Sequence, residues 1–327
     1  MRYSRQEILL GQKGQKILQK SLVAIVGCGG TGSAAAEYLA RAGVSLRLID
    51  RDIVELGNLQ RQLYTEEDIG KPKAIQLKEK LEGVNGDVKI EAVNDDLNQS
   101  NIDKYLKGTS LVLDGTDTMT TRFLVNDWCL KNHVPFTYAA SVRGEGLFTL
   151  LVPKETACLQ CFVPVKSVGK LDTCETAGIN GPVAGMIGTI SAAETVNFLS
   201  GRTVIKNSLL HINMDRNTFE LIELKKKKDC PACHGTYNFL DVPVADITRL
   251  CGNAFQYIFR NNVDVGRVAR NIQNNPSLGI GIISKSNNML QLKYKDQIIT
   301  VFSTRMIVQN IYSERAVKLI ASKIIGL

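Results

Sequence analysis

Six residues at positions 27–32 have the types and spacing of a phosphate-binding loop. Gly27-Cys28-Gly29-Gly30-Thr31-Gly32 fits the pattern G-x-G-x-x-G, with a short apolar run before it and an alanine-rich stretch after it. Glycine lets the backbone approach phosphate oxygens, and the following helix supplies N–H donors and the positive end of its dipole. Asp50, at the usual distance further on, is placed to bind a ribose hydroxyl. The pattern predicts a site for NAD, FAD or ATP, and glycines that serve only helix packing are the alternative.

Basic residues in the next segments distinguish between these nucleotides. Segments 57–62 and 70–73 are expected to bring Arg61 and Lys73 toward the loop. A triphosphate and a second anionic reactant repel each other, and guanidinium and ammonium groups hold them together. Both residues therefore favour ATP over a dinucleotide. Asp117, in the sequence DGTD after a later strand, adds a carboxylate at the same sheet edge, where it is suited to hold Mg²⁺.

Four of the eight cysteines form two C-x-x-C pairs, Cys158 with Cys161 and Cys230 with Cys233. Four thiolates close a tetrahedral zinc site and leave no coordination position open, so such a site is structural. It would tie the loop after the central sheet to the end of a later hairpin. A redox role is the rival interpretation, but neither pair opens a helix directly after a strand.

The order of apolar segments predicts the fold class. Strands are expected at 21–27, 45–50, 88–93 and 110–114, with helical segments between them. Strands that alternate with helices indicate an α/β fold with a Rossmann-like, doubly wound, mostly parallel sheet. Later segments of the same domain are strands at 134–140 and 146–152, a functional loop at 153–182, a buried helix at 183–199, and a hairpin at 209–214 and 219–224.

A change of pattern after this hairpin predicts a second domain. Residues 1–235 are expected to form the first domain, which carries the four cysteines, and residues 236–327 a small α+β accessory domain. In the second domain, helices are expected at 264–272 and 313–325, and strands at 278–283 and 289–301.

Composition limits the class of protein. The chain has 327 residues, 44% of them hydrophobic and 22% charged, and lacks an apolar stretch of about 20 residues that would cross a bilayer. Its first 20 residues interrupt apolar positions with charges and so do not resemble a signal peptide. We therefore expect a cytoplasmic protein without a membrane partner. The net charge of +8 suits nucleic acid, an anionic surface or an acidic protein, and does not choose among them.

Taken together, these motifs resemble the MoeB/ThiF/HesA family of adenylyltransferases, the prokaryotic relatives of ubiquitin-activating enzymes. The resemblance covers about residues 2–235 and includes RYSRQ, GCGGTG, LIDRD, GNLQRQ, IGKPK, DGTD and both cysteine pairs, in the family's order. Thr31 and Thr118 depart from the commoner family residues, and neither change removes a charge. The segment after Tyr237 does not resemble the rhodanese domain of some relatives, so any sulfur donor is expected to be a separate protein.

The resemblance implies an activity and assigns roles. The implied reaction is adenylation, with ATP and Mg²⁺, of the C-terminal glycine of a small ubiquitin-like sulfur-carrier protein that ends in Gly-Gly, which prepares the carrier for thiocarboxylation in molybdopterin, thiamine or thiolated-tRNA biosynthesis. Arg5 is implied to reach the triphosphate of the other protomer in a homodimer, and Cys174 to receive the activated acyl group. The implied ATP and magnesium residues are Gly30, Asp50, Asn58, Arg61, Gln62, Lys73 and Asp117.

Three rivals stay open on sequence alone. The glycine loop by itself permits an NAD-dependent oxidoreductase, although no hydride-transfer constellation is evident and Arg61 and Lys73 argue against it. An adenylating enzyme that acts on tRNA or a small molecule is the second rival. A catalytically idle scaffold is the third, and the intact charged positions disfavour it. Nucleic acid is not the expected partner.

Overall fold

The structure is a computed structural model that describes residues 2–167, 177–202, 204–242, 246–250, 253–259, 261–286 and 289–326. The chain divides into two compact units, Met1–Val242 and Pro243–Leu327. Among the described residues, no helix combines the length and the apolarity that crossing a bilayer requires.

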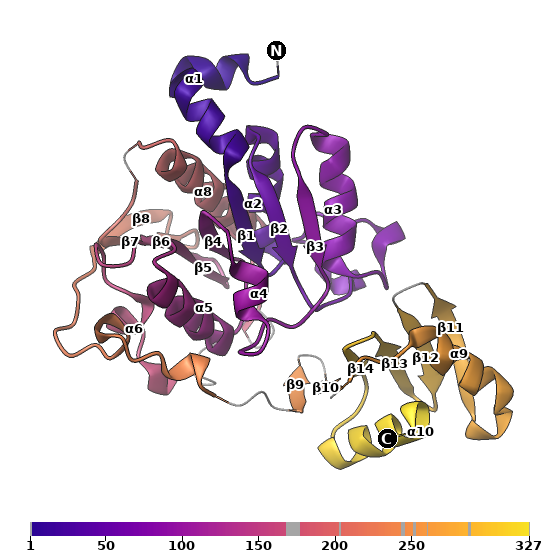
Figure 1. The fold of residues 1–327 in the computed structure, drawn as a ribbon. Coiled ribbons are helices and arrows are strands. Elements are labelled where there is room, and N and C mark those ends of the chain that lie inside the picture. Colours follow the sequence, from indigo (N-terminus) through magenta and orange to yellow (C-terminus); the bar gives the residue numbers. More distant parts are fainter. Residues whose placement is uncertain are drawn as a thin grey trace. The chain divides into compact units, whose positions relative to one another are not determined.

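The first unit is built on an eight-stranded sheet of order β3-β2-β1-β4-β5-β6-β7-β8 (Figure 1). Its strands are β1 (Leu22–Val26), β2 (Ser45–Ile49), β3 (Ile90–Val93), β4 (Leu111–Asp114), β5 (Phe136–Val142), β6 (Glu145–Leu151), β7 (Ser208–Asn213) and β8 (Thr218–Glu223). The pairs from β3 to β5 are parallel, and those from β5 to β8 are antiparallel. The predicted α/β, mostly parallel sheet is confirmed.

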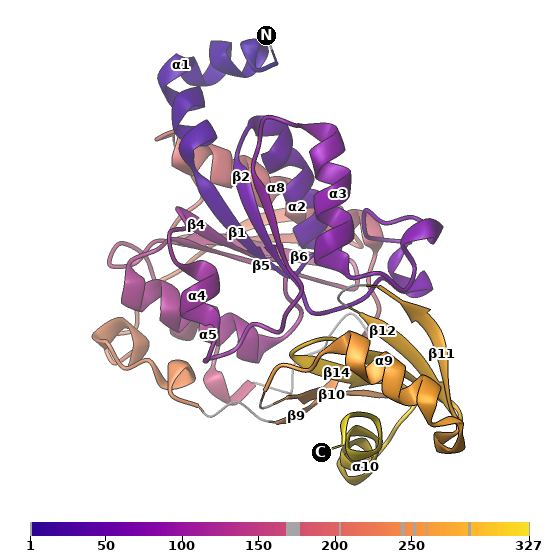
Figure 2. The same cartoon turned by 45° about the vertical axis from the view of Figure 1, so that its right-hand side comes forward.

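Helices cover both faces of this sheet (Figure 2). They are α1 (Ser4–Lys20), α2 (Gly30–Ala42), α3 (Lys73–Val84), α4 (Ile102–Leu106), α5 (Met119–Asn132), α6 (Leu159–Phe162) and α8 (Gly181–Leu199). One core contains side chains of α2, α3 and α8, and the other contains those of α4 and α5. Because both faces of β1 are covered, its residues Val23, Ala24 and Ile25 are fully buried, as expected of a continuous apolar run in a parallel strand.

The strand order reverses between β1 and β4, which are direct neighbours. The connection from β1 leads to β2 on one side, and the connection from β4 leads to β5 on the other. At such a point the connections leave the two strands in opposite directions, and the carboxyl edge of the sheet there, here called the crevice, is where ligands bind in folds of this kind. The loops here are residues 27–29 and 115–118, which are the two segments singled out in the sequence.

The second unit has its own core beneath a six-stranded antiparallel sheet of order β11-β12-β13-β14-β10-β9. Its elements are β9 (Ile247–Leu250), β10 (Ala254–Ile258), α9 (Val265–Asn274), β11 (Ile280–Lys285), β12 (Leu290–Tyr294), β13 (Gln297–Val301), β14 (Arg305–Val308) and α10 (Glu314–Ile325). The strand expected at 278–283 begins two residues late, because residues 276–278 form a short 3-10 turn. The sequence did not predict β9, β10 or β14.

A buried carboxylate on α5, that of Asp127, holds the tail of the first unit against the sheet. Its Oδ2 accepts the Phe239 N–H at 3.1 Å, and its Oδ1 accepts an N–H from Nε2 of Gln160, in α6, at 2.8 Å. The Phe239 ring stacks on Phe123 with centroids 4.9 Å apart. These contacts explain why the first unit continues past Gly235, the boundary expected from sequence, to Val242.

Replacing Asp127 with Asn should change how stability depends on pH. Burial raises the pKa of Asp127 from 3.8 to about 6, against hydrogen bonds that lower it. Ionising the Asp127 carboxylate in the folded protein therefore lowers the free energy of unfolding. This loss is fully present above about pH 6 and disappears as the pH falls toward 3.8, the pKa of an ordinary aspartate. Relative to Asp127→Asn, the wild type should gain about 1 kcal/mol in unfolding free energy between about pH 8 and about pH 5. Denaturant titrations measure this, and parallel pH profiles for the two proteins would contradict it.

Candidate active site and metal centre

Three glycines at the strand-order reversal meet backbone to backbone. Gly27 has φ +90°, in the left-handed region that favours glycine. A Cβ on Gly32 or on Gly115 would collide with the Gly27 carbonyl oxygen. Any side chain at these positions would therefore push apart the loop after β1, the start of α2 and the loop after β4. Gly29 is different, because a Cβ there would have ordinary contacts, the nearest at 3.7 Å from Gln62 Nε2.

The carboxylate of Asp50 closes one side of the glycine loop. Its Oδ2 accepts the Cys28 N–H at 2.6 Å and its Oδ1 accepts the Asp52 N–H at 2.7 Å, while only 9% of the residue is exposed. Burial raises the pKa of Asp50, and the charge of Lys73 opposes that rise. The structure thus places Asp50 directly on the glycine loop.

Lys73 begins α3 and points toward a group of carboxylates. Its Nζ lies 3.2 Å from Asp52 Oδ2, and the side chain is 8% exposed. Burial alone would lower the pKa of Lys73, but the charges of Asp52, Asp50 and Asp117 outweigh burial and raise it above its usual value. Lys73 is therefore a permanent cation near both loops. The influence of Asp117 on it places that exposed carboxylate in the same electrostatic environment.

The segment with Asn58, Arg61 and Gln62 folds over the start of α2. Asn58 is buried and its Oδ1 accepts the Glu55 N–H at 3.0 Å, which fixes the 3-10 turn Leu56–Asn58. Nη1 of Arg61 donates to the Gly57 carbonyl at 2.7 Å, and the backbone oxygen of Arg61 packs against Gly30. The two predicted basic residues and the glycine loop thus come from adjacent elements.

Gln62 provides a test of whether this crevice fits a polar ligand. Within the described residues, its buried Oε1 has no hydrogen-bond partner, whereas buried acceptors are nearly always paired. Its Nε2 lies beside Gly29. An unpaired acceptor next to a glycine cradle and a helix N-terminus fits a nucleotide, whose hydroxyl or amino group would supply the missing donor. Sequence reasoning placed Gln62 at the site but gave no sign of its unpaired oxygen.

The residues that depart from the commoner family pattern are accommodated locally. Thr31 Oγ1 lies 3.4 Å from Ser141 Oγ, a contact between the start of α2 and β5. Thr118 is the residue before α5, and its hydroxyl donates to Thr121 Oγ1 at 2.8 Å. Neither hydroxyl adds a charge to the site.

Arg5 belongs to the first turn of α1, a helix that lies at the opposite edge of the sheet from the carboxyl ends of β1 and β2 (Figure 1). The first turn of α1 is fixed at the far end of α2, where Gln6 Nε2 donates to the Ala42 carbonyl and Asn85 Nδ2 donates to Tyr3 Oη. The 13 residues of α2 separate these contacts from the glycine loop, a distance of about 20 Å. Exposed Arg5 is therefore out of reach of the crevice in its own chain.

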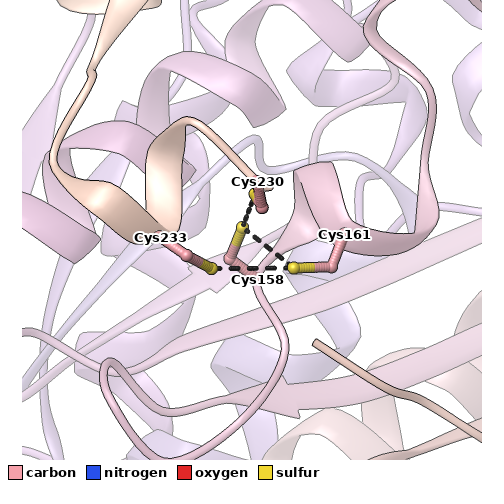
Figure 3. Close-up of side chains that lie close together, drawn as sticks. All are labelled: Cys158, Cys161, Cys230 and Cys233. Carbon is pink, nitrogen blue, oxygen red and sulfur yellow. Dashed lines mark hydrogen bonds between the residues drawn. The ribbon is translucent and has the colours of Figure 1, made fainter. Parts of the chain in front are cut away.

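The sulfur atoms of the four cysteines lie close together between α6 and the turn at residues 230–234 (Figure 3). The Sγ of Cys158 lies 3.8 Å from that of Cys161 and 3.5 Å from that of Cys230, and Cys161 lies 3.6 Å from Cys233. Tetrahedral zinc with Zn–S bonds of about 2.3 Å requires sulfurs about 3.8 Å apart. The spacing and the all-thiol donor set therefore fit zinc, and the predicted cluster is confirmed.

The electrostatics of the cluster also suit a metal. The hydrogen bond from Cys158 lowers the pKa of Cys161 to about 4, and backbone N–H groups of Lys227 and Cys158 add to the effect. A lowered pKa favours the thiolate, which is the form of cysteine that binds metal. Of the other cysteines in the described chain, Cys28 and Cys129 are buried. Cys174 lies outside the described residues.

Comparison with known proteins identifies the family. The ThiF family model matches residues 3–232. The chain belongs to the ThiF family. It is 37% identical over 263 residues to the sulfur carrier protein ThiS adenylyltransferase of Bacillus subtilis, which covers 77% of each chain. It is also 37% identical to the SAMP-activating enzyme E1 of Haloferax volcanii, over 71% of this chain and 88% of that one.

The sequence relatives establish the enzyme class, and a solved structure supports the fold. The chain is an adenylyltransferase of the ThiF family, as its motifs predicted. Among solved structures, Escherichia coli MccB superposes with a TM-score of 0.64 at 24% identity, over 71% of this chain and 75% of that chain. That likeness concerns the fold alone.

The cysteine cluster gives a direct test. Cys230→Ser should lower co-purified zinc from about one per chain to well below that, because three thiolates leave a tetrahedral site open. The melting temperature should fall with it. Cys129→Ser, at a buried cysteine outside the cluster, is the control and should keep the metal. Elemental analysis and thermal denaturation measure both, and full zinc content in Cys230→Ser would exclude the four-cysteine site.

Proposed function

We propose that this enzyme uses ATP to adenylate the C-terminal carboxylate of a small ubiquitin-like sulfur-carrier protein that ends in Gly-Gly. The observation that carries the proposal is the meeting of the glycine loop, the permanent cation Lys73 and Asp117 at the strand-order reversal. The names of the bacterial and archaeal relatives, which specify the sulfur carrier ThiS and SAMP, support the choice of acceptor. The later pathway depends on the carrier and its partners.

The residues of the site have distinct roles in the proposed reaction. The N-terminus of α2 and the backbone around Gly29 and Gly30 receive the phosphates, and Asp50 orients the ribose. Arg61 and Lys73 offset the repulsion between the triphosphate and the carrier's carboxylate. The carboxylate then attacks the α-phosphorus, the bond to the β-phosphate oxygen breaks, and pyrophosphate leaves. Asp117 would hold Mg²⁺, which supplies charge neutralisation at the phosphates.

The proposed reaction is reversible while pyrophosphate is present, which allows a specific assay. Asp117→Ala should reduce carrier-dependent exchange between pyrophosphate and ATP by about 100-fold or more, because it removes the carboxylate assigned to the metal. Asp87→Ala, at an exposed residue of the opposite edge, is the control and should exchange normally. Wild-type exchange in Asp117→Ala would overturn the assignment of Asp117, and no exchange in the wild type would overturn the proposed function.

A homodimer in which α1 serves the partner's crevice explains the position of Arg5. On the same helix, Ile8 is 87% and Leu9 63% exposed, so two neighbouring large apolar side chains are available for another surface to cover. We propose that a second copy covers them, and that Arg5 then completes the partner's triphosphate site.

Mixing two inactive variants tests this arrangement. Arg5→Ala and Asp117→Ala should each have little exchange activity, whereas mixed dimers contain one crevice with both residues intact. After exchange of subunits in equal amounts, about one quarter of the wild-type rate should return. Each variant mixed with itself is the control. An inactive mixture that nonetheless contains mixed dimers would show that Arg5 does not act across the interface.

Cys174 is proposed to accept the acyl group after adenylation, with a separate persulfide donor as the other sulfur source. Adenylation needs no nucleophile from the enzyme. Cys174→Ala should therefore keep pyrophosphate exchange while it loses a carrier–enzyme adduct, which mass spectrometry under non-reducing conditions detects. Thiocarboxylate formation at the wild-type rate in Cys174→Ala would remove this cysteine from the chemistry.

The second unit is proposed to be an accessory domain. Every charged residue assigned to ATP precedes Val242, so we assign to residues 243–327 the adjustment of partner binding rather than catalysis.

A further inference from the structure

The guanidinium of Arg122, on the second turn of α5, is buried beneath the DGTD loop. Its Nε donates to Asp114 Oδ2 at 2.8 Å, and its Nη2 donates to the carbonyls of Thr116 at 2.5 Å and Ala139 at 2.9 Å. The group also lies over the ring of Tyr138, at 5.2 Å. One side chain thus joins the end of β4, the loop after it and β5. No step of the proposed reaction involves this side chain.

This network gives the two aspartates of the loop different roles. Asp114 is 1% exposed, and its Oδ1 accepts both the N–H and the hydroxyl of Thr116, at 2.9 and 2.7 Å. Its oxygens are therefore committed to Arg122 and Thr116. Asp117 is exposed and comes one residue after the carbonyl that Arg122 holds. The Asp114 carboxylate fixes the shape of the loop, and the Asp117 carboxylate lies exposed at its end.

The same loop also touches the phosphate loop directly. Gly115, between Asp114 and Thr116, packs against the carbonyl of Gly27 so closely that no side chain fits. A change in the path of the loop at Thr116 therefore alters the position of Asp117 relative to the N-terminus of α2. Asp117 would hold Mg²⁺ beside the phosphate loop only at a suitable separation, because Mg²⁺ demands near-ideal octahedral geometry.

We propose that Arg122 is a positioning residue that fixes Asp117 relative to the phosphate loop and thereby sets how strongly Mg²⁺ enhances ATP binding. The inference rests on the proposed function, since it takes Asp117 as the group that holds the metal. Arg122 itself touches neither nucleotide nor metal. Groups that orient a metal ligand in this way commonly change metal affinity by about 10- to 100-fold when they are replaced.

Lysine is an informative substitution because it keeps the charge and loses the geometry. Arginine donates from a rigid plane, whereas lysine has one flexible ammonium group that cannot reach the Asp114 carboxylate and both carbonyls together. Arg122→Lys should therefore keep the buried ion pair and release the Thr116 carbonyl. Thr116→Val is a milder second variant, which removes the hydroxyl donated to Asp114 and leaves no buried charge unpaired.

Arg47 offers a matched control in the same sheet. Its guanidinium is also largely buried, pairs with Glu91 at 2.7 Å and donates to the carbonyls of Tyr105 and Lys107 at 2.9 and 3.1 Å. These groups belong to β2, β3 and the end of α4, and none belongs to the proposed site. Arg47→Lys should cost stability in the same way without altering the response to Mg²⁺.

The experiment measures binding of the non-hydrolysable analogue α,β-methylene ATP by calorimetry, with and without Mg²⁺, in full-length protein. In the wild type and in Arg47→Lys, Mg²⁺ should tighten binding to the same extent. In Arg122→Lys, the factor by which Mg²⁺ increases affinity for the analogue should fall by about 10-fold, while affinity without Mg²⁺ changes little. In Thr116→Val, the same factor should also fall.

Three results would decide against the inference. An undiminished gain from Mg²⁺ in both Arg122→Lys and Thr116→Val, with lower melting temperatures, would show that Arg122 only stabilises the fold. Equal losses in Arg47→Lys would show a general effect of instability. If Mg²⁺ did not increase the affinity of the wild type for the analogue, Asp117 would have no metal role and Arg122 would have no positioning role. A wild type that binds no nucleotide would instead overturn the proposed function itself.

Discussion

The close approach of three backbone segments at Gly27, Gly32 and Gly115 is the constraint on which the active-site half of this protein depends. It places the loops after β1 and β4 in direct contact at the strand-order reversal. The N-terminus of α2 and the loop that presents Asp117 are parts of the same contact. The charged residues can then be supplied by flanking segments. Lys73 at the start of α3 and Arg61 beside Gly30 do not build the crevice, and the proposed function assigns to them the preference for a triphosphate.

A second feature of the site is that its charges compensate one another without ligand. Lys73 pairs with Asp52, and Arg51 pairs with Asp96 at 2.9 Å. Several charges of both signs thus lie at one sheet edge, where each reduces the cost of burying the others. In the proposed function, a triphosphate that enters such an environment would exchange partners with these ion pairs. Discrimination between anions would then depend on the number of charges satisfied together, which would favour a ligand with several phosphates over one with few.

The sequence predicted the parts of the structure that local patterns determine. The apolar run before Gly27, the alanine-rich α2 and Asp50 at the end of β2 are each recognisable within a short window, and the two C-x-x-C pairs are recognisable by spacing. The burial of Asp114 and the exposure of Asp117 were not predictable, because they depend on hydrogen bonds from Arg122 in the next helix. The attachment of Phe239 to Phe123 and Asp127 was missed for the same reason. In the second unit, fully buried Gln256 and Arg305 lie within strands and obscure the apolar pattern that would have revealed β10 and β14.

The cysteine cluster connects segments that are far apart along the chain, since Cys158 and Cys230 are separated by 72 residues. Helix α8 and the β7–β8 hairpin lie between them. In an unfolded chain, closing a loop of this length has an entropic cost of about 4 kcal/mol. Packing of the helix and the hairpin on the sheet offsets this cost, because it brings the two pairs together. A metal ion that binds all four sulfurs would therefore stabilise the chain in which the antiparallel half of the sheet is complete over one in which it is not.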